Sequence, residues 1–158
     1  MPTKILVPLD GSKVGEAALP YIESLVAKLV SSDKVEVTLI QAVSSLVHYV
    51  VVGEEAVRAP YTPQEIEQMK KKAQQYLTEA GASLRLKGAA TNVRVSVGNS
   101  AEEILKAADE LAVDMIAMSS HGRSGLSRLT FGSVTDKVLR GSNRPVLVVK
   151  APKGLNNG

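Results

Sequence analysis

Residues 118–140 read MSSHGRSGLSRLTFGSVTDKVLR, and their layout predicts an anion-binding loop between a strand and a helix. An apolar run ends here, a loop rich in glycine, serine and arginine follows, and a helical pattern begins at Gly132 and Ser133. The start of a helix leaves backbone N–H groups without intrahelical partners and carries partial positive charge. Glycines let the backbone approach a ligand closely, and the serines and arginines add donors and charge. The stretch therefore favours a phosphate at the start of this helix.

Two common nucleotide-binding patterns are absent from the chain. There is no G-x-x-x-x-G-K-[ST], which argues against a Walker-type NTPase, and no G-x-G-x-x-G follows a predicted strand. The chain instead has Ser119-Ser120-His121-Gly122, then nine residues, then Gly132-Ser133.

This spacing closely resembles that of the universal stress protein family, whose nucleotide-binding members carry Gly-x-x-Gly, nine residues and Gly-Ser/Thr. Ser119 stands where that pattern has its first glycine. The resemblance covers residues 4–151, because KILVPLDGS at residues 4–12 and NRPVLVVK at residues 143–150 are similar to the family's first and last strands. It implies an adenine nucleotide alpha hydrolase-like α/β fold, with parallel strands in the order 3-2-1-4-5. Better-known members bind ATP or AMP, and others bind no nucleotide.

Hydrophobic periodicity independently predicts an α/β fold. Apolar runs at residues 5–9, 35–43, 113–118 and 146–149 suit strands that are covered on both faces, and residues 91–97 supply a fifth strand. Apolar residues recur at helical spacing within residues 17–29, 66–84, 101–111 and 134–139. This alternation predicts a doubly wound, five-stranded parallel sheet. Such sheets bind ligands beyond the carboxyl ends of the strands, where the strand order reverses.

With the family's strand order, that crevice lies between the first and fourth strands. The residues that we expect to contact a nucleotide are Pro8, Leu9, Asp10, Val43, Met118, Ser119, His121, Gly122, Arg123, Gly132, Ser133 and Val134. The resemblance places Asp10 on the nucleoside and the backbone of Val43 at the adenine edge. Asp10 or Ser12 can alternatively cap the first helix, and Val43 can be ordinary strand core. At position 119 the added Cβ and hydroxyl either crowd the ligand or donate a hydrogen bond to it.

The same residues favour binding over fast catalysis. His121 has no evident nucleophile or carboxylate partner, and two histidines without cysteine do not make a zinc site. A Mg²⁺ or Mn²⁺ ion held through the nucleotide's phosphates is compatible with few protein ligands. No general base or Walker lysine is visible. We therefore expect a regulatory nucleotide-binding protein of the stress response, with a slow ATPase or nucleotide hydrolase and a nucleotide-free interaction domain as the alternatives.

Composition is typical of one globular domain, which we expect over residues 1–151 of the 158, with a frayed tail at 152–158. The chain has no cysteine, no leader sequence and no apolar run long enough for a membrane span, so the cytoplasm is the expected compartment. The net charge is +3, but the basic residues are dispersed and aromatic residues make up only 3%. Nucleic-acid binding is therefore disfavoured.

Two further expectations concern assembly and a long loop. In the family order the last strand, residues 145–150, lies at an edge of the sheet, yet it is apolar. An exposed edge of this kind needs a partner, so we expect a homodimer through antiparallel pairing of two last strands, as the resemblance also implies. Residues 44–62 are too long for a plain turn and form either a lid or contact surface, or a flexible insertion.

Overall fold

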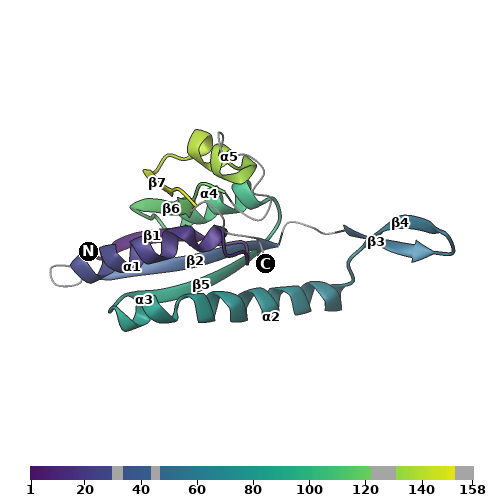
Figure 1. The fold of residues 1–158 in the computed structure, drawn as a ribbon, viewed down its shortest axis with the longest axis horizontal. Coiled ribbons are helices and arrows are strands. Elements are labelled where there is room, and N and C mark those ends of the chain that lie inside the picture. The colour runs from purple at the N-terminus through teal and green to yellow at the C-terminus, as the bar shows by residue number, and fades with distance from the viewer. Residues whose placement is uncertain (30–33, 44–46, 122–130, 152–158) are drawn as a thin grey trace.

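Five parallel strands form the central sheet, as the ribbon of Figure 1 shows. The structure, a computed structural model, describes residues 1–29, 34–43, 47–121 and 131–151. The strands of the sheet are β1 (Thr3–Pro8), β2 (Val35–Val43), β5 (Ala90–Val97), β6 (Met115–Ser119) and β7 (Val146–Val149). Their order across the sheet is β5-β2-β1-β6-β7.

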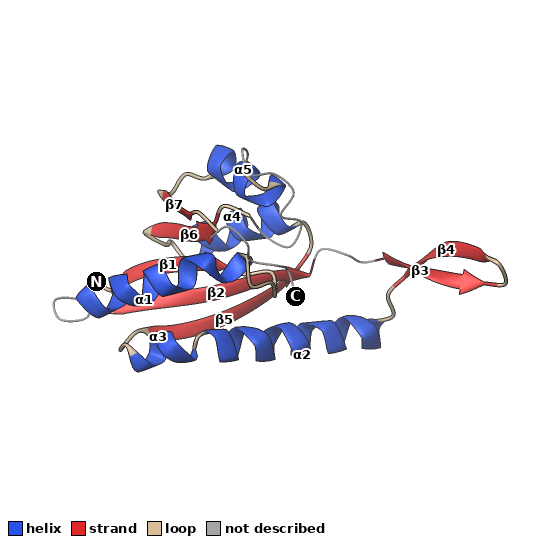
Figure 2. Ribbon diagram, viewed as in Figure 1, coloured by secondary structure: helices blue, strands red, loops and turns tan. Residues whose placement is uncertain are grey.

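Helices cover both faces of this sheet (Figure 2). One face packs against the short 3-10 helix η1 (Gly15–Ala18), α1 (Leu19–Leu29), α2 (Pro63–Ala80) and α3 (Ala82–Leu86), and the other against α4 (Ser100–Glu110) and α5 (Ser133–Gly141). Strand β1 shows why two layers are needed. Ile5 and Val7 join the core beneath α1 and α2, while Leu6 between them joins the core beneath α4 and α5. A strand that buries successive side chains on opposite faces requires cover on both.

The predicted fold class, an α/β fold with a five-stranded parallel sheet between helices, is confirmed. If only the five strands of this sheet are numbered along the chain, their order across the sheet is 3-2-1-4-5. The labels β5-β2-β1-β6-β7 differ because β3 and β4, which form a separate hairpin, are also numbered. Strand β1 lies between β2 and β6, and the order reverses there. In parallel sheets this reversal opens a crevice at the carboxyl ends of the strands.

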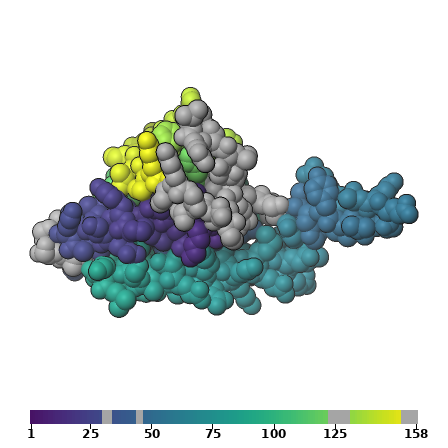
Figure 3. All heavy atoms as spheres, in the orientation of Figure 1, coloured from purple at the N-terminus to yellow at the C-terminus, as the bar shows by residue number. Residues whose placement is uncertain are grey.

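The two additional strands correct the view of residues 44–62 as a loop. β3 (Val47–Val52) and β4 (Glu55–Pro60) pair antiparallel in a sheet of their own, and this hairpin projects from the body of the molecule in Figure 3. Gly53 occupies the turn at φ +67°, a conformation that glycine adopts readily. The sequence analysis predicted neither strand; Glu55, Arg58 and Pro60 make β4 look polar, and an apolar run at β3 alone does not show a hairpin. The hairpin is nonetheless apolar and exposed at Tyr49 (73%) and Val51 (74%).

Helix α2 begins with a capping box. The hydroxyl of Thr62 accepts a hydrogen bond from the backbone N–H of Glu65 at 3.2 Å, and the carboxylate of Glu65 accepts one from the N–H of Thr62 at 2.6 Å. The latter bond lowers the pKa of Glu65. The helix expected over residues 66–84 is divided at Gly81, where an added Cβ would lie 2.8 Å from Cγ2 of Thr91. Helix α2 thereby ends where the chain must pack closely against β5.

No described helix is long and apolar enough to cross a membrane. The tail expected to fray beyond residue 151 lies outside the described residues.

The hairpin allows a direct test of how independent it is of the sheet. Replacing residues 47–60 by a flexible Gly/Ser segment of equal length should change the free energy of unfolding by no more than about 0.5 kcal/mol, the usual size of a surface effect. The reason is that β3 and β4 pair only with each other among the described strands. Urea denaturation of both proteins measures the difference. A large loss of stability would show that the hairpin supports the sheet.

Candidate functional site

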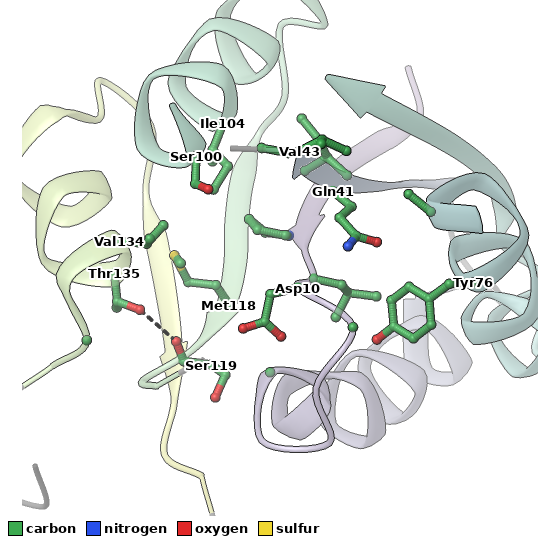
Figure 4. A pocket seen from close by; sticks show the side chains of 18 of the residues that line it. Asp10, Gln41, Val43, Tyr76, Ser100, Ile104, Met118, Ser119, Val134 and Thr135 are labelled. Carbon is green, nitrogen blue, oxygen red and sulfur yellow. Dashed lines mark hydrogen bonds between the residues drawn. The ribbon is translucent and has the colours of Figure 1, made fainter. Parts of the chain in front are cut away.

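A cavity of about 740 Å³ opens at the carboxyl ends of β1, β2 and β6 (Figure 4). Its volume falls within the range of small-molecule sites, roughly 300–1,000 Å³. One wall comes from α2, and the opposite wall comes from the first turns of α4 and α5. The cavity therefore lies across the crevice that the reversal of strand order creates.

Ten of the twelve predicted site residues line this cavity: Pro8, Leu9, Asp10, Val43, Met118, Ser119, His121, Gly132, Ser133 and Val134. The other two, Gly122 and Arg123, lie outside the described residues. The structure thus brings the ends of β1, β2 and β6 together with the start of α5. Contact between these residues and a nucleotide stays a prediction.

Sequence analysis missed the α2 wall. Met69, Lys72, Ala73 and Tyr76 line the cavity, as does Gln41 near the end of β2. Met69, Ala73 and Tyr76 had been assigned to the core by their helical spacing, which does not show that one end of a helix extends beyond the sheet. Gln41 carried a usable signal, because it is a polar residue within the apolar run of β2.

Asp10 and Ser12 shape the turn between β1 and η1. Oδ1 of Asp10 accepts hydrogen bonds from the backbone N–H of Ser12 at 2.9 Å and from its hydroxyl at 2.6 Å. The Ser12 hydroxyl oxygen in turn accepts a bond from the N–H of Gly15, at the start of η1, at 3.0 Å. The N-cap of η1 is Val14, which makes no side-chain capping bond, so neither Asp10 nor Ser12 is the N-cap residue. Asp10 instead holds Ser12, whose hydroxyl oxygen receives the first N–H of η1. Figure 4 shows the Asp10 carboxylate within the cavity.

Gly15 is required by this arrangement for reasons of space. A Cβ built on Gly15 would overlap Oδ1 of Asp10 and would lie 3.1 Å from Oγ of Ser12. The first contact is shorter than real Cβ atoms make and the second is tight, so any side chain at position 15 must displace the carboxylate that faces the cavity.

Ser119 makes a hydrogen bond across the crevice. Its hydroxyl donates to the carbonyl oxygen of Val14 at 2.9 Å, and the side chain is only 4% exposed. The backbone N–H of His121 donates to the same Oγ at 3.4 Å. The hydroxyl is thus directed toward the chain that enters η1, and it joins the end of β6 to the segment after β1.

The chain after β6 is tied to α5 and to β7. The hydroxyl of Thr135 donates to the carbonyl of Ser119 at 2.9 Å, and the N–H of Gly132 donates to the carbonyl of Ser120 at 2.9 Å. Oγ of Ser120 lies 3.0 Å from Nδ1 of His121 and accepts a bond from the N–H of Ala151 at 3.1 Å. These bonds hold the first turn of α5 against the cavity.

Helix α5 presents unpaired donors there. Gly132 is its N-cap and makes no side-chain capping bond, and the first intrahelical bond runs from the N–H of Asp136 to the carbonyl of Gly132 at 2.9 Å. The N–H groups of Ser133, Val134 and Thr135 have no acceptor among the residues that the structure describes. All three residues line the cavity. The cavity therefore has a local positive potential suited to an anion.

Val43 has a more ordinary environment. Its side chain is buried, and its carbonyl accepts a hydrogen bond from the N–H of Gly98 at 3.1 Å, just beyond the pairing of β2 with β5. The carbonyl of Val43, one of its two backbone groups expected at the adenine edge, is thus already hydrogen-bonded within the protein.

One buried polar atom on the α2 side of the cavity, Oε1 of Gln41, lacks a hydrogen-bond partner in the described parts of the chain, which costs about 1–3 kcal/mol. The hydroxyl of Tyr76 has no partner within ordinary hydrogen-bond distance there, but it faces the carboxylate of Glu16 and the backbone of Gly11. Burial, and then the negative charge of Glu16, raise the pKa of Tyr76 well above its usual range.

The two histidines of the chain have different settings. His121 lines the cavity, whereas His48 lies in β3 with its ring centroid 4.3 Å from that of Tyr61. Within residues 1–29, 34–43, 47–121 and 131–151, no group of three or more His, Cys, Asp or Glu side chains could hold a metal ion.

The profile of the universal stress protein family matches residues 1–150. The chain belongs to the universal stress protein family. Universal stress protein MJ0531 of Methanocaldococcus jannaschii is 30% identical over 151 residues, which are 95% of this chain and 83% of the relative. The solved structure of protein MJ0577, which is from the same organism, superimposes with a TM-score of 0.71 at 27% identity and covers 98% of this chain and 99% of its own.

Solved structures of other family members contain nucleotides. The Arabidopsis thaliana protein with AMP bound has a TM-score of 0.66 at 15% identity, covering 96% of this chain and 94% of its own. A member in complex with cAMP has a TM-score of 0.63 at 24% identity, covering 96% and 98%. The Archaeoglobus fulgidus protein in complex with dAMP has a TM-score of 0.59 at 21% identity, covering 95% and 98%. At these identities the likeness shows a common fold.

The bond made by Ser119 gives a stability prediction. Ser119→Ala should lower the free energy of unfolding by about 0.5–1.5 kcal/mol, the net worth of one hydrogen bond, because the Val14 carbonyl loses this donor and keeps only the N–H of Ala17 at 3.2 Å. Urea denaturation measures the loss. Thr78→Ala is the matched control, because its hydroxyl also donates to a carbonyl, that of Gln74 at 2.8 Å, but on the surface. The control should cost no more than about 0.5 kcal/mol. Equal effects would show that the Ser119 bond does not join the two loops.

Proposed function

We propose that this universal stress protein binds an adenine nucleotide, ATP or AMP, in the cavity, with its phosphates at the start of α5. The observation that carries the proposal is the set of N–H groups of Ser133, Val134 and Thr135, which have no acceptor among the described residues and border a cavity of about 740 Å³. A phosphate there gains backbone hydrogen bonds and the favourable end of the helix dipole. The hydroxyl of Ser133, at the exposed rim, adds a donor.

The other parts of the cavity suit a nucleoside. The carboxylate of Asp10 can accept hydrogen bonds from ribose hydroxyls, and the apolar side chains of Ile104, Met118 and Val134 offer a surface for a base. Gly122 and Arg123 remain proposed phosphate contacts from the sequence alone. A Mg²⁺ or Mn²⁺ ion would be held mainly by the nucleotide's phosphates, because the described residues offer no cluster of ligands.

Ser119 does not argue against this proposal. The hydroxyl that replaces the family's first glycine is hydrogen-bonded to Val14, so it is directed away from the centre of the cavity. Relatives of the same fold with AMP, cAMP and dAMP bound support an adenine nucleotide as the ligand class.

We further propose that the protein regulates partners in the stress response through its nucleotide-bound state and turns over slowly or not at all. The support for slow turnover comes from the sequence, which has no Walker lysine and no evident general base to activate water. Phosphate release by the pure protein at about 10 per second, a typical enzymatic rate, would instead favour the ATPase alternative.

Two glycine variants test the binding mode. Gly15→Ala should displace Asp10 and weaken AMP and ATP binding by about tenfold to one-hundredfold, the usual worth of a hydrogen bond to a charged group. Gly132→Val should weaken ATP binding severely, because its side chain obstructs the approach to α5. Lys71→Ala, on the outer surface of α2, should have no effect. Isothermal titration calorimetry measures all three, and a wild-type protein that binds no adenine nucleotide contradicts the proposal.

We also propose a homodimer through β7. This strand lies at the edge of the sheet, and Val146–Val149 is only partly buried. The carbonyls of Pro145 and Val149 accept hydrogen bonds from Ile116 and Ser120 on the β6 side. Because backbone groups alternate along a strand, those of Val146 and Val148 are directed outward, where a second copy of β7 can pair with them across a twofold axis.

Val148→Pro is a sharp test of that pairing. It removes an outward-directed N–H and leaves the hydrogen bonds to β6 in place, so the variant should fold and be a monomer. Light scattering at high micromolar concentration distinguishes the two states. A dimeric Val148→Pro variant, or a monomeric wild-type protein, would overturn the proposed interface.

A further inference from the structure

The hairpin of β3 and β4 has two edges of different character. The β4 edge contains the charged residues Glu55 and Arg58 and ends at Pro60, which has no N–H. Charges and proline on an edge strand hinder its pairing with another chain. β3 reads VHYVVV and contains no lysine, arginine, aspartate, glutamate or proline. Only the β4 edge is therefore protected against the addition of a strand.

The outer edge of β3 presents backbone groups to solvent. Val52 and Glu55 face each other across a two-residue turn, so they exchange hydrogen bonds. Alternation along the strand then directs the N–H and carbonyl groups of Tyr49 and Val51 away from β4. No further backbone partner of either residue lies in the described parts of the chain. Their side chains are exposed as well, on a hairpin that projects from the body of the molecule (Figure 3).

The hairpin also lacks a third strand. A two-stranded hairpin alone is at best marginally stable in water, and a further strand with apolar contacts stabilises it. The strands of the central sheet do not supply one, because β3 and β4 pair only with each other among the described strands. An exposed, uncharged run of valine and aromatic residues readily pairs with another such run. The third strand therefore has to come from another molecule.

The sequence of β3 is complementary to itself. If two copies pair antiparallel about a twofold axis at Val50, Tyr49 lies opposite Val51 of the partner subunit, and the outward backbone groups of these residues become hydrogen-bond partners. Pairs of an aromatic and a β-branched side chain stabilise a sheet. In the same register His48 lies opposite Val52 of the partner subunit. No like charges meet, because the charged residues of the hairpin are in the turn and in β4.

We propose that the outer edge of β3 is a self-association surface, at which a second copy of this chain adds its own β3 in antiparallel pairing centred on Val50. The contact is separate from the pairing proposed for β7 and does not rest on the nucleotide site. A standard interface has about 20–30 residues a side, whereas only residues 48–52 pair here. The contact therefore links copies transiently, and copies joined through β7 remain the stable unit.

Disulfide trapping in the full chain detects a transient contact of this kind. The chain has no cysteine, so Val50→Cys introduces a single thiol at the centre of the pairing. Residues opposite each other in a non-hydrogen-bonded antiparallel pair have Cα atoms about 4.5 Å apart, within the disulfide range of about 4.4–6.8 Å. With diamide as the oxidant, non-reducing gel electrophoresis should show cross-linked dimers of this variant.

Val57→Cys is the matched control. Val57 lies opposite Val50 in the same hairpin, but on β4, and the two side chains are exposed to similar extents, 45% and 38%. Val50→Cys should cross-link at least about tenfold faster than Val57→Cys, because pairing raises the effective concentration of its thiols. The rate at which each variant reacts with a maleimide corrects for a difference in thiol reactivity.

Two proline variants show whether the cross-link requires backbone pairing. Val51→Pro, combined with Val50→Cys, removes an outward N–H of β3 and should abolish the faster cross-linking. Ala56→Pro removes an outward N–H of β4, directly opposite Val51, and should leave the faster cross-linking unchanged. Equal cross-linking of the two cysteine variants, or equal effects of the two prolines, would overturn the proposed surface.

Discussion

The hydrogen bond between the Ser119 hydroxyl and the Val14 carbonyl closes the ligand-facing edge of the sheet. Strand β1 and strand β6 run side by side, but their chains diverge beyond the sheet, one toward η1 and the other toward α5. The Ser119 bond joins these diverging segments at 2.9 Å, and Thr135 binds the carbonyl of the same residue. The positions of Asp10 and of the first turn of α5 therefore depend on each other. A cavity between two loops is well defined only when the loops are fixed in this way.

The polar groups around the cavity divide into satisfied and unsatisfied sets. The satisfied set fixes the backbone around the cavity. Asp10 accepts hydrogen bonds from Ser12, Ser119 donates to Val14, and Ser120 accepts from Ala151. The first N–H groups of α5 and the amide oxygen of Gln41 have no partner among the described residues. Leaving such groups unpaired costs stability, and proteins retain that cost mainly where a ligand removes it.

The sequence predicted the central fold well because apolar runs and helical spacing both report burial. It placed five strands and the loop before α5, and most of the predicted site residues line one cavity. It did not find β3 and β4, which pair with each other in the long segment after β2, nor the α2 wall. Tyr76 has the spacing of a core residue, and only its place at the end of a helix brings it to the cavity. Periodicity shows which face of a helix is buried, but it does not show whether that face packs against the core or borders a cavity.

Position 119 shows why a departure from a motif has to be judged in three dimensions. A glycine gives the backbone freedom, whereas a serine adds a group that needs a partner when buried. Here the partner is Val14, 105 residues away along the chain and adjacent in the fold. The exchange adds a fixed link between the end of β6 and the segment that enters η1. The same reasoning applies to Gly15, whose small size is required by Asp10 and which no local pattern identifies.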